Sequence, residues 1–207
     1  SIRKATQILG LTYEEIPTNS KGQIDSERLK NISDACLVLT AGTTSTGAID
    51  CLNLVGHAKW THIDAAWAGP LRLSKTHAHL LFGIEKADSI SVSAHKWLFQ
   101  PKDAALVMFR DIEKANSAIS FGGGYLNVPN VGIQGSRGAS AIPLLATLIA
   151  WGIEGLVERI DRTMLMADIL AEKLKNKKGI LIWSMPTTGI TVFRSTKYST
   201  QYLLKKL

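Results

Sequence analysis

Short apolar segments recur along the chain, and each of them ends in small or polar residues. They span residues 35–40, 60–66, 89–93 and 104–109. Runs of this length, without the spacing of an amphipathic helix, are typical of strands that are covered on both faces, as in a parallel sheet. Because segments with helical spacing lie between the runs, the sequence predicts an α/β fold, a mostly parallel sheet flanked by helices on both faces.

The predicted helices surround these strands, and two aspartates lie where helices are expected to begin. Asp25 precedes a short helical pattern, and Asp50 is expected to cap a helix that ends near Ala58. The other segments with helical spacing are 3–11, 75–82 and 141 to about 177.

A glycine-rich, polar stretch at 120–138 is too long for a plain connection between two elements. We therefore expect a domain boundary near residue 138, with a large α/β domain at 1–138. The remaining residues, 139–207, contain the long helical segment, two apolar runs at 179–185 and 190–193, and an amphipathic end. This arrangement predicts the start of a smaller α+β domain.

Composition argues against several classes of partner. Lys and Arg outnumber Asp and Glu by 24 to 17, but the excess is scattered and its denser patches carry no interleaved aromatic residues, so nucleic-acid binding is not expected. No uninterrupted apolar run approaches the roughly 20 residues that cross a bilayer, and there is no signal-peptide pattern. The two cysteines, Cys36 and Cys51, lie in apolar settings without metal-type spacing, which predicts reduced, buried thiols in a cytoplasmic protein.

A lysine and an aspartate lie where two of the predicted strands end. Lys96 follows the strand at 89–93, and Asp64 lies near the end of the strand at 60–66. A lysine in such a place is costly unless its amine is used, although a surface lysine is the more ordinary explanation. One inward lysine and one inward carboxylate are the minimum for holding pyridoxal phosphate (PLP), the lysine as a Schiff base and the carboxylate beside the pyridine nitrogen.

Small and hydroxyl-bearing residues complete this candidate site. Ala66 and its small neighbours would let a flat ring lie against the strand, while Ser93, His95 and Thr44 could meet the cofactor's phosphate or substrate. Ligands of open α/β sheets bind beyond the carboxyl ends of the strands, where all these residues are predicted to lie. Tight packing and loop hydrogen bonds are the ordinary alternatives for each of them.

An ordered series of motifs resembles the group II PLP-dependent amino acid decarboxylases, which act on aromatic amino acids, glutamate, histidine and diaminobutyrate. The interval between Asp64 and Lys96 also fits that family, and the resemblance covers residues 1 to about 175. The matching motifs are Gly42-Thr43-Thr44 with Gly47 and Asp50, His62-Ile63-Asp64-Ala65-Ala66-Trp67-Ala68-Gly69, and Ala87-Asp88-Ser89 leading to His95-Lys96-Trp97-Leu98.

The resemblance implies a fold-type I PLP-dependent transferase-like architecture and a role for each matching residue. Lys96 would form the Schiff base, Asp64 would pair with the pyridine nitrogen, and Ala66 would pack on one face of the ring. Ser93 and His95 would meet the phosphate, with His95 also near the reacting carbon, and Thr44 would lie near cofactor and substrate. Tyr125, beside Leu126 in the glycine-rich stretch, would return a proton to the substrate carbon, and Ser136-Arg137 would reach a partner subunit's site.

The implied activity is decarboxylation of an L-amino acid to an amine and CO₂ by a homodimer with its site at the interface. Compared with the family, the chain is expected to be a fragment that lacks the N-terminal part and the end of the small domain, and its stretch between Asp50 and Asp64 is short. Two alternatives stay open: another PLP reaction on the same scaffold (a lyase, an aldehyde-forming decarboxylase or a transaminase), or a non-catalytic remnant of the fold. His77 and His79 are two apart on a predicted helix and so do not share a face, so no metal site is expected there.

Overall fold

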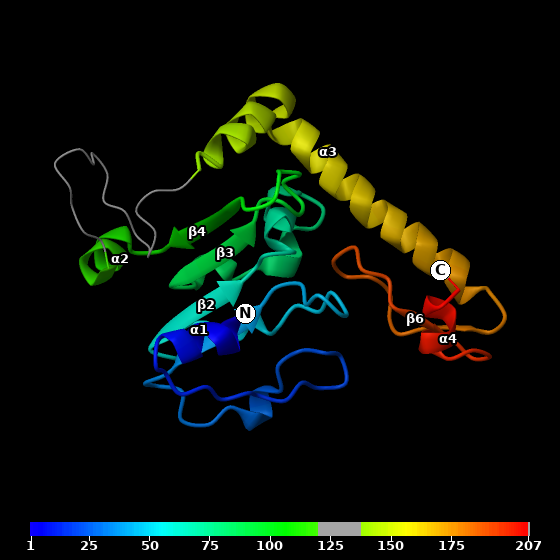
Figure 1. The fold of residues 1–207 in the computed structure, drawn as a ribbon, viewed down its shortest axis with the longest axis horizontal. Helices are drawn as coiled ribbons and strands as arrows, with labels where there is room; N and C mark the ends of the chain where they lie inside the picture. The colour runs from blue at the N-terminus through cyan, green and yellow to red at the C-terminus, as the bar shows by residue number, and fades with distance from the viewer. Residues whose placement is uncertain (120–137, 207) are drawn as a thin grey trace.

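The computed structural model describes residues 1–119 and 138–206, and a sheet of four strands lies at the centre of this part of the chain (Figure 1). The strands follow the order β1-β2-β3-β4 across the sheet. β1, β2 and β3 are parallel, and β4 is antiparallel to β3. The bounds are Cys36–Thr40 for β1, Trp60–Asp64 for β2, Ser89–Ser93 for β3 and Ala105–Phe109 for β4. The predicted, mostly parallel sheet is thereby confirmed.

β4 turns back along β3 because the connection between them folds into a compact turn. The N–H groups of Ala94 and His95 both donate to the carbonyl of Ala104, at 2.9 and 3.3 Å. A parallel return would need a crossover of a dozen or more residues, usually with a helix. The turn that carries Lys96 is therefore closed by main-chain hydrogen bonds between its start, at Ala94 and His95, and its end, at Ala104.

The two faces of the sheet differ in chemistry, which the expectation of strands covered alike on both sides did not capture. On β2, Thr61 and Ile63 are fully buried, whereas Trp60, His62 and Asp64 on the opposite face are only half-buried. The core lies on the first face and includes Leu39, Ile63, Leu71, Leu81, Leu156 and Ile160. The second face is polar over β2 and β3, and it carries the predicted site residue Asp64.

Short 3₁₀ helices replace the α-helices that were predicted between the strands. Their bounds are Ser26–Arg28 (η1), Leu52–Leu54 (η2), Gly69–Leu73 (η3), Ala78–Leu81 (η4) and Ile84–Lys86 (η5). Gly56 and Gly83 adopt φ values of 88° and 95°, which end regular helix at those points. The helices predicted at 50–58 and 75–82 are therefore corrected to single 3₁₀ turns.

Of the two aspartates predicted to cap helices, one does so in the structure and the other does not. Asp25 caps η1 by accepting a hydrogen bond from Glu27 N. Asp50 is instead a buried tie between segments, because its carboxylate accepts from Ile24 N at 2.6 Å and from Thr40 N at 2.7 Å. The predicted helix cap at Asp50 is wrong, since its oxygens are used by strand β1 and by the loop before η1.

One α-helix precedes the four strands of the sheet in the sequence, and two more follow them. α1 (Ile2–Ile8) buries none of its residues, and α2 (Ile112–Ile119) follows β4. α3 (Ala141–Lys175) is bent where Gly152 takes a φ of 63°, and it packs on the sheet domain through Leu156, Ile160 and Met164. Figure 1 shows α3 running from beside the sheet to the C-terminal elements.

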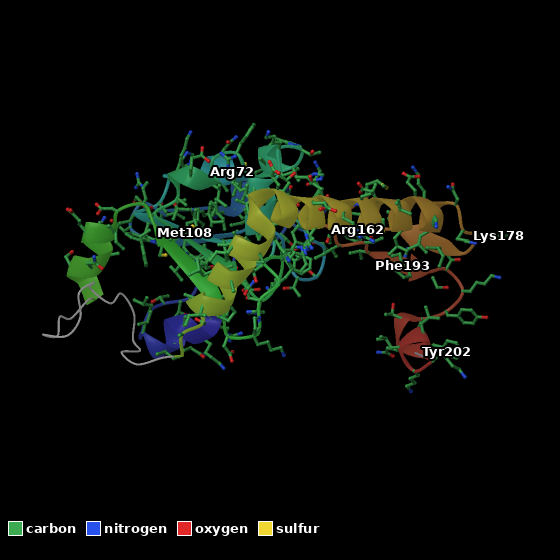
Figure 2. The ribbon with its side chains drawn as sticks, turned by 90° about the horizontal axis from the view of Figure 1, so that it is seen from above. Arg72, Met108, Arg162, Lys178, Phe193 and Tyr202 are labelled. Carbon is green, nitrogen blue, oxygen red and sulfur yellow. The ribbon has the colours of Figure 1, made fainter. Side chains whose placement is uncertain are left out.

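The C-terminal elements lie at the far end of α3. They are the antiparallel pair β5 (Ile180–Ile182) and β6 (Phe193–Ser195), followed by α4 (Thr200–Leu204). Seen from above, Phe193 and Tyr202 lie well away from Met108 of β4 (Figure 2). The mixture of helix and strand agrees with the predicted α+β character, while the domain boundary near residue 138 stays a prediction.

One expectation from composition is wrong, and the structure adds a finding about α3. Cys36 and Cys51 are exposed free thiols rather than buried ones, because their neighbours Leu37 and Leu52 take the inward positions. α3 is long and apolar enough to cross a membrane by length and composition alone, since charged residues are absent from 141–153. Only 6% of its most apolar window is buried in the structure.

Candidate active site

The carboxyl ends of β1, β2 and β3 meet at one edge of the sheet and bring most predicted site residues together. Thr40 pairs with Asp64, and Asp64 pairs with Ser91, in the parallel register. Beyond the strands, Ala41 N donates to Asp64 O at 2.8 Å, and Ser93 N donates to Ala66 O at 3.3 Å. Asp64, Ala66 and Ser93 therefore lie side by side, as the sequence predicted.

Asp64 presents a half-buried carboxylate at the end of β2. Its Oδ1 accepts a hydrogen bond from Ala66 N at 3.1 Å, which fixes the rotation of the carboxyl group. Among the described residues, Oδ2 has no hydrogen-bond partner. The carboxylate thus keeps one oxygen available for a further donor at the sheet edge.

Lys96 and His95 lie in the turn that follows β3. Lys96 N donates to Ser93 O at 3.2 Å, and the Lys96 side chain is half-buried. His95 is exposed, and its Nδ1 lies 3.1 Å from the carbonyl oxygen of Ala104. A carbonyl only accepts, so Nδ1 carries the hydrogen and Nε2 of a neutral His95 is left as an acceptor.

The two threonines in the loop after β1, Thr43 and Thr44, differ in their contacts. Thr43 Oγ1 hydrogen-bonds Thr46 Oγ1 at 2.8 Å and accepts from Ala48 N at 3.1 Å, so it stabilises the loop. Thr44 is exposed and takes no part in these bonds, and its role near cofactor and substrate stays a prediction. Gly42 has a φ of 91°, and a Cβ there would lie 2.8 Å from Trp67 Cδ1, so the loop depends on glycine at this position.

Two tryptophans beneath the site are joined to the C-terminal part of the chain, a feature that the sequence did not reveal. The rings of Trp67 and Trp97 have centroids 5.0 Å apart. Trp67 Nε1 donates to Thr188 O at 2.7 Å, and a Cβ on Gly189 would lie 2.8 Å from the Trp97 ring. The buried Thr188 hydroxyl in turn donates to Gly47 O at 2.7 Å. The loop around Thr188 therefore supports the floor of the site.

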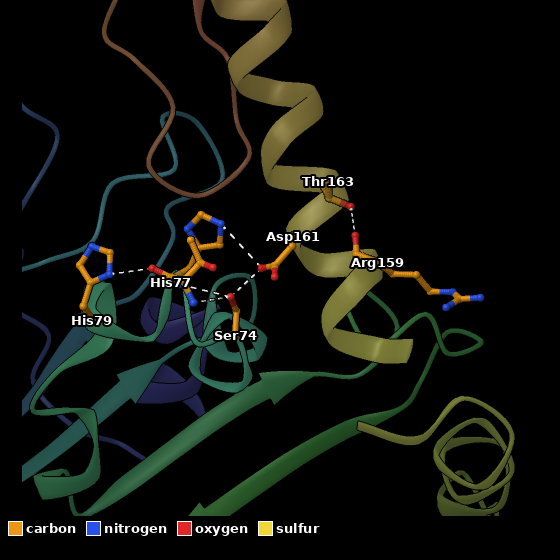
Figure 3. Close-up of polar contacts among 7 residues, drawn as sticks. Ser74, His77, His79, Arg159, Asp161 and Thr163 are labelled. Carbon is orange, nitrogen blue, oxygen red and sulfur yellow. Dashed lines mark hydrogen bonds and ion pairs between the residues drawn. The ribbon is translucent and has the colours of Figure 1, made fainter. Parts of the chain in front are cut away.

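A second polar cluster attaches α3 to the sheet domain (Figure 3). Ser74 Oγ donates to Asp161 Oδ1 of α3 at 2.6 Å, and His77 Nε2 lies 3.7 Å from the same oxygen. His79 instead points to the carbonyl of Thr76, at 3.0 Å from Nδ1. The two histidines thus have separate partners, and within residues 1–119 and 138–206 no group of three potential metal ligands is found.

The main cavity in the described part of the chain lies away from the predicted site, and some predicted site residues fall outside that part. A cavity of about 720 Å³ lies between the loop before η1, the crossover near Asp50 and the C-terminal segment near Trp183, and none of the predicted site residues lines it. Tyr125 with Leu126, and Ser136-Arg137, fall in the stretch that the structure does not describe.

Comparisons with known proteins give a consistent picture of the chain's relatives. The family model described as the pyridoxal-dependent decarboxylase conserved domain matches residues 1–196. L-2,4-Diaminobutyrate decarboxylase of Rhizobium meliloti (strain 1021) is 31% identical over 223 residues, which cover 94% of this chain and 44% of that protein. Cysteine sulfinic acid decarboxylase of Homo sapiens is 29% identical over 208 residues, covering 86% and 42%.

The crystal structure of mouse CSAD in its apo form superposes on this chain with a TM-score of 0.82 at 26% identity. The match covers 94% of this chain and 46% of the mouse protein. The chain therefore spans somewhat less than half the length of the relatives that it matches.

Proposed function

The chain belongs to the family of pyridoxal-dependent decarboxylases, and on that premise we propose that its protein converts an L-amino acid to an amine and CO₂ with PLP attached to Lys96. One observation carries the proposal. Asp64 and the turn containing Lys96 lie at the carboxyl ends of neighbouring parallel strands, tied together by the bond from Ser93 N to Ala66 O. That edge is where open α/β sheets bind their ligands.

The residues at this edge fit PLP in the chemistry of their donors and acceptors. A primary amine at Lys96 suits the aldehyde, and an available carboxylate oxygen at Asp64 suits a protonated ring nitrogen. Ala66 leaves room for a flat ring. The hydroxyls of Ser93 and Thr44, with the imidazole of His95, supply donors for a phosphate or a substrate carboxylate.

When bound, PLP supplies an electron sink that accepts the electron pair released as CO₂ departs. Asp64 supports this chemistry by holding a proton on the ring nitrogen through its negative charge. Lys96 would hold the cofactor through its side-chain amine. His95, whose Nδ1 is engaged by the Ala104 carbonyl, would receive or deliver a proton at the reacting carbon through Nε2, a role that Tyr125 would share.

A homodimer is part of the proposal, supported by apolar side chains that α3 leaves exposed. Ile142, Leu145, Ile149 and Ile153 have exposed fractions of 55% or more. Large contiguous apolar patches are uncommon on monomeric proteins and mark interfaces. We also propose a cytoplasmic location, which the two free thiols favour because unpaired cysteines persist in reducing compartments.

Reduction with borohydride followed by peptide mapping tests the attachment site directly. The protein is incubated with PLP, reduced and digested, and we expect the pyridoxyl label on the peptide that contains Lys96. Lys102, exposed a few residues downstream, serves as the matched control, and Lys102→Ala should label as the unchanged protein does. Absence of label, or label on another lysine, contradicts the proposal.

An assay of products then separates decarboxylation from other PLP reactions. A panel of L-amino acids that includes diaminobutyrate, cysteine sulfinate and aromatic amino acids is scored for CO₂, amine and aldehyde. Equal amounts of CO₂ and amine are expected for at least one substrate. Labelled protein that yields aldehyde or a keto acid instead would identify another reaction on the same scaffold, and labelled protein that turns over no substrate would support the non-catalytic alternative.

A further inference from the structure

The turn that carries Lys96 contains a backbone conformation that its sequence does not favour. Phe99 has a φ of 58°, in the left-handed region that glycine, asparagine and aspartate adopt far more readily than a bulky residue does. Phe99 N donates to Lys96 O at 3.1 Å, and Lys96 N donates to Ser93 O at 3.2 Å. The main chain of Lys96 is therefore held on both sides, and one of the two bonds comes from the strained residue.

Contacts with α3 help to stabilise this conformation, since a strained residue persists only where its surroundings determine it. The Phe99 ring packs edge-on against Trp151 of α3, with the ring centroids 5.8 Å apart. The guanidinium of Arg159 lies 3.9 Å from the centroid of the Trp151 ring and donates to Gly155 O at 2.7 Å. The side of α3 that faces the turn is thus itself held in place. Phe99 is still 42% exposed, so packing of its ring is only part of the explanation.

The buried side chain of Gln100 joins the same turn to α3 by hydrogen bonds. Gln100 is 7% exposed, and its Nε2 donates to Leu98 O at 2.6 Å and to Thr147 Oγ1 of α3 at 3.0 Å. A carbonyl only accepts, so the amide nitrogen of Gln100, and not its amide oxygen, faces Leu98. Thr147 Oγ1 donates its own hydrogen to Pro143 O at 2.9 Å, which leaves it as an acceptor for Gln100. Both hydrogens of the Gln100 amide are therefore used.

These bonds fix both peptide groups that flank Phe99. The first group contains Leu98 O, which accepts from Gln100 Nε2, and the second contains Gln100 N, which donates to Ala94 O at 3.1 Å. Because peptide groups are planar, the φ and ψ of Phe99 are set once both groups are fixed. Loss of the Gln100 amide would free the first group, so that Phe99 could relax and its N–H could leave Lys96 O.

We infer that Gln100 is a positioning residue for Lys96: bonded to Thr147 of α3, it holds the turn in the left-handed conformation at Phe99 through which the Lys96 main chain is fixed. The inference rests on the proposed function, because this positioning acts on catalysis only if Lys96 binds PLP. The amine of Lys96 reaches the cofactor from one main-chain position, and α3 determines that position through a single buried amide.

Substitutions on both sides of the Gln100–Thr147 bond test this inference in the PLP-loaded protein. Gln100→Leu removes both amide bonds, and Thr147→Val removes the acceptor on α3 at nearly constant side-chain volume. We expect the PLP dissociation constant to rise about tenfold in each, as for the loss of a buried hydrogen bond. The midpoint of the pH titration of the bound cofactor's visible absorbance band, which reports on the Schiff base at Lys96, should shift in the same direction in both. Thr147→Ser keeps the hydroxyl and should restore both properties.

Thr163→Val is the matched control, because the Thr163 hydroxyl makes the same kind of bond within α3, to Arg159 O at 2.8 Å (Figure 3). In the part of the chain that the structure describes, no hydrogen bond joins Thr163 to the Lys96 turn. The PLP dissociation constant and the titration midpoint should therefore stay unchanged in this variant. A merely structural role for Gln100 would lower the melting temperature of Gln100→Leu without moving either property, and that outcome overturns the inference, as does a failure of Thr147→Ser to restore them.

Hydrogen exchange of the PLP-free protein, followed by NMR, gives a readout that does not depend on the cofactor. The N–H of Phe99 is bonded to Lys96 O, and we expect it to exchange at least about tenfold faster in Gln100→Leu and Thr147→Val than in Thr163→Val or the unchanged protein. Equal exchange in all four proteins overturns the inference. If the unchanged protein forms no absorbance band with PLP, the proposed function fails, while the exchange of the Phe99 N–H still decides whether Gln100 holds the turn.

Discussion

At the scale of single residues, two aspartates outside the active site hold strand ends by accepting main-chain N–H groups. Asp50 is buried and binds Ile24 N and Thr40 N, and Asp88 binds Thr61 N at 2.8 Å and forms an ion pair with Arg110. Charge-assisted bonds of this type are stronger than neutral ones. The Asp50 bond fixes the carboxyl end of β1, which borders the predicted cofactor site, and the Asp88 bond fixes the amino end of β2, at the opposite edge of the sheet.

Asp50→Asn should destabilise the fold by about 2 kcal/mol, because the amide keeps one acceptor and turns an N–H₂ donor toward a main-chain N–H. Urea unfolding followed by circular dichroism measures the change. Asp34→Asn, at an exposed aspartate, is the control and should change the free energy of unfolding by well under about 0.5 kcal/mol. Equal effects of the two substitutions would contradict the structural role of Asp50.

Asp88 should make stability depend on pH in the acid range. Burial opposes ionisation, but the hydrogen bonds from Thr61 N and Arg110, with the charges of Arg110 and Lys114, lower the pKa of Asp88 below its ordinary value. A carboxyl whose pKa is lower in the folded state stabilises the fold at pH values above its unfolded-state pKa of about 4. This stabilisation is lost as the pH falls through the folded-state pKa.

The free energy of unfolding of Asp88→Asn should therefore fall below that of the unchanged protein at pH 7, and the difference should shrink toward zero near pH 2. Unfolding curves at both pH values give the comparison. A difference that stays constant with pH would show that the charge of Asp88 does not stabilise the fold.

At the scale of elements, the strands could be predicted from the sequence, but the connections between them could not. β3 lies where the apolar run at 89–93 placed it, since a strand covered by a core is recorded in its own residues. The crossovers were predicted as α-helices because their apolar spacing is helical, yet glycine at Gly56 and Gly83 limits them to 3₁₀ turns. Asp50 was expected to cap one of those helices, and its distant partners are not visible in local sequence.

The site shows the same division. Asp64 and Lys96 could be found because each follows a strand, and the rule for parallel sheets places such residues together. The bond from Trp67 Nε1 to Thr188 O joins residues 121 positions apart, so no local sequence pattern predicts it. The hydrogen bonds of His62 with Ser89 and Ser91 were missed for a related reason, because they depend on the register between β2 and β3.

The Ser74–Asp161 contact should control how firmly α3 is held against the sheet domain. Ser74 Oγ donates to Asp161 and also accepts from Thr76 N and His77 N, so Asp161→Ala removes the contacts of α3 with Ser74 and His77 but leaves the turn at Ser74 intact. We expect Asp161→Ala to raise hydrogen exchange in residues 156–164 of α3 and to cost about 1–2 kcal/mol of stability. Glu158→Gln, on the exposed side of α3, is the control, and equal exchange in both variants would argue against the contact.

At the scale of the whole molecule, the two parts of α3 differ in whether the sheet domain covers their apolar side chains. Leu156, Ile160 and Met164 are covered by the sheet domain, while the turns before the bend at Gly152 expose Ile142 and Ile149. Exposed apolar surface of this kind is uncommon on monomeric proteins and marks interaction sites. The most apolar part of α3 therefore decides between a monomer and the proposed homodimer.

Ile149→Glu should dissociate the proposed homodimer, because Ile149 is 76% exposed within one chain and a buried glutamate in an apolar interface would lack a partner. Sedimentation velocity across a range of concentrations should show the dimer dissociation constant rising at least about tenfold. Leu11→Glu introduces the same charge at an apolar residue that is 59% exposed but far from α3 in sequence, and it should leave the dimer intact. If the unchanged protein sediments as a monomer, or if both variants dissociate alike, the apolar surface of α3 does not form the interface. If Ile149→Glu dissociates the dimer and also weakens PLP binding, a site shared between two subunits explains both effects, since the substitution lies outside the residues that hold the cofactor.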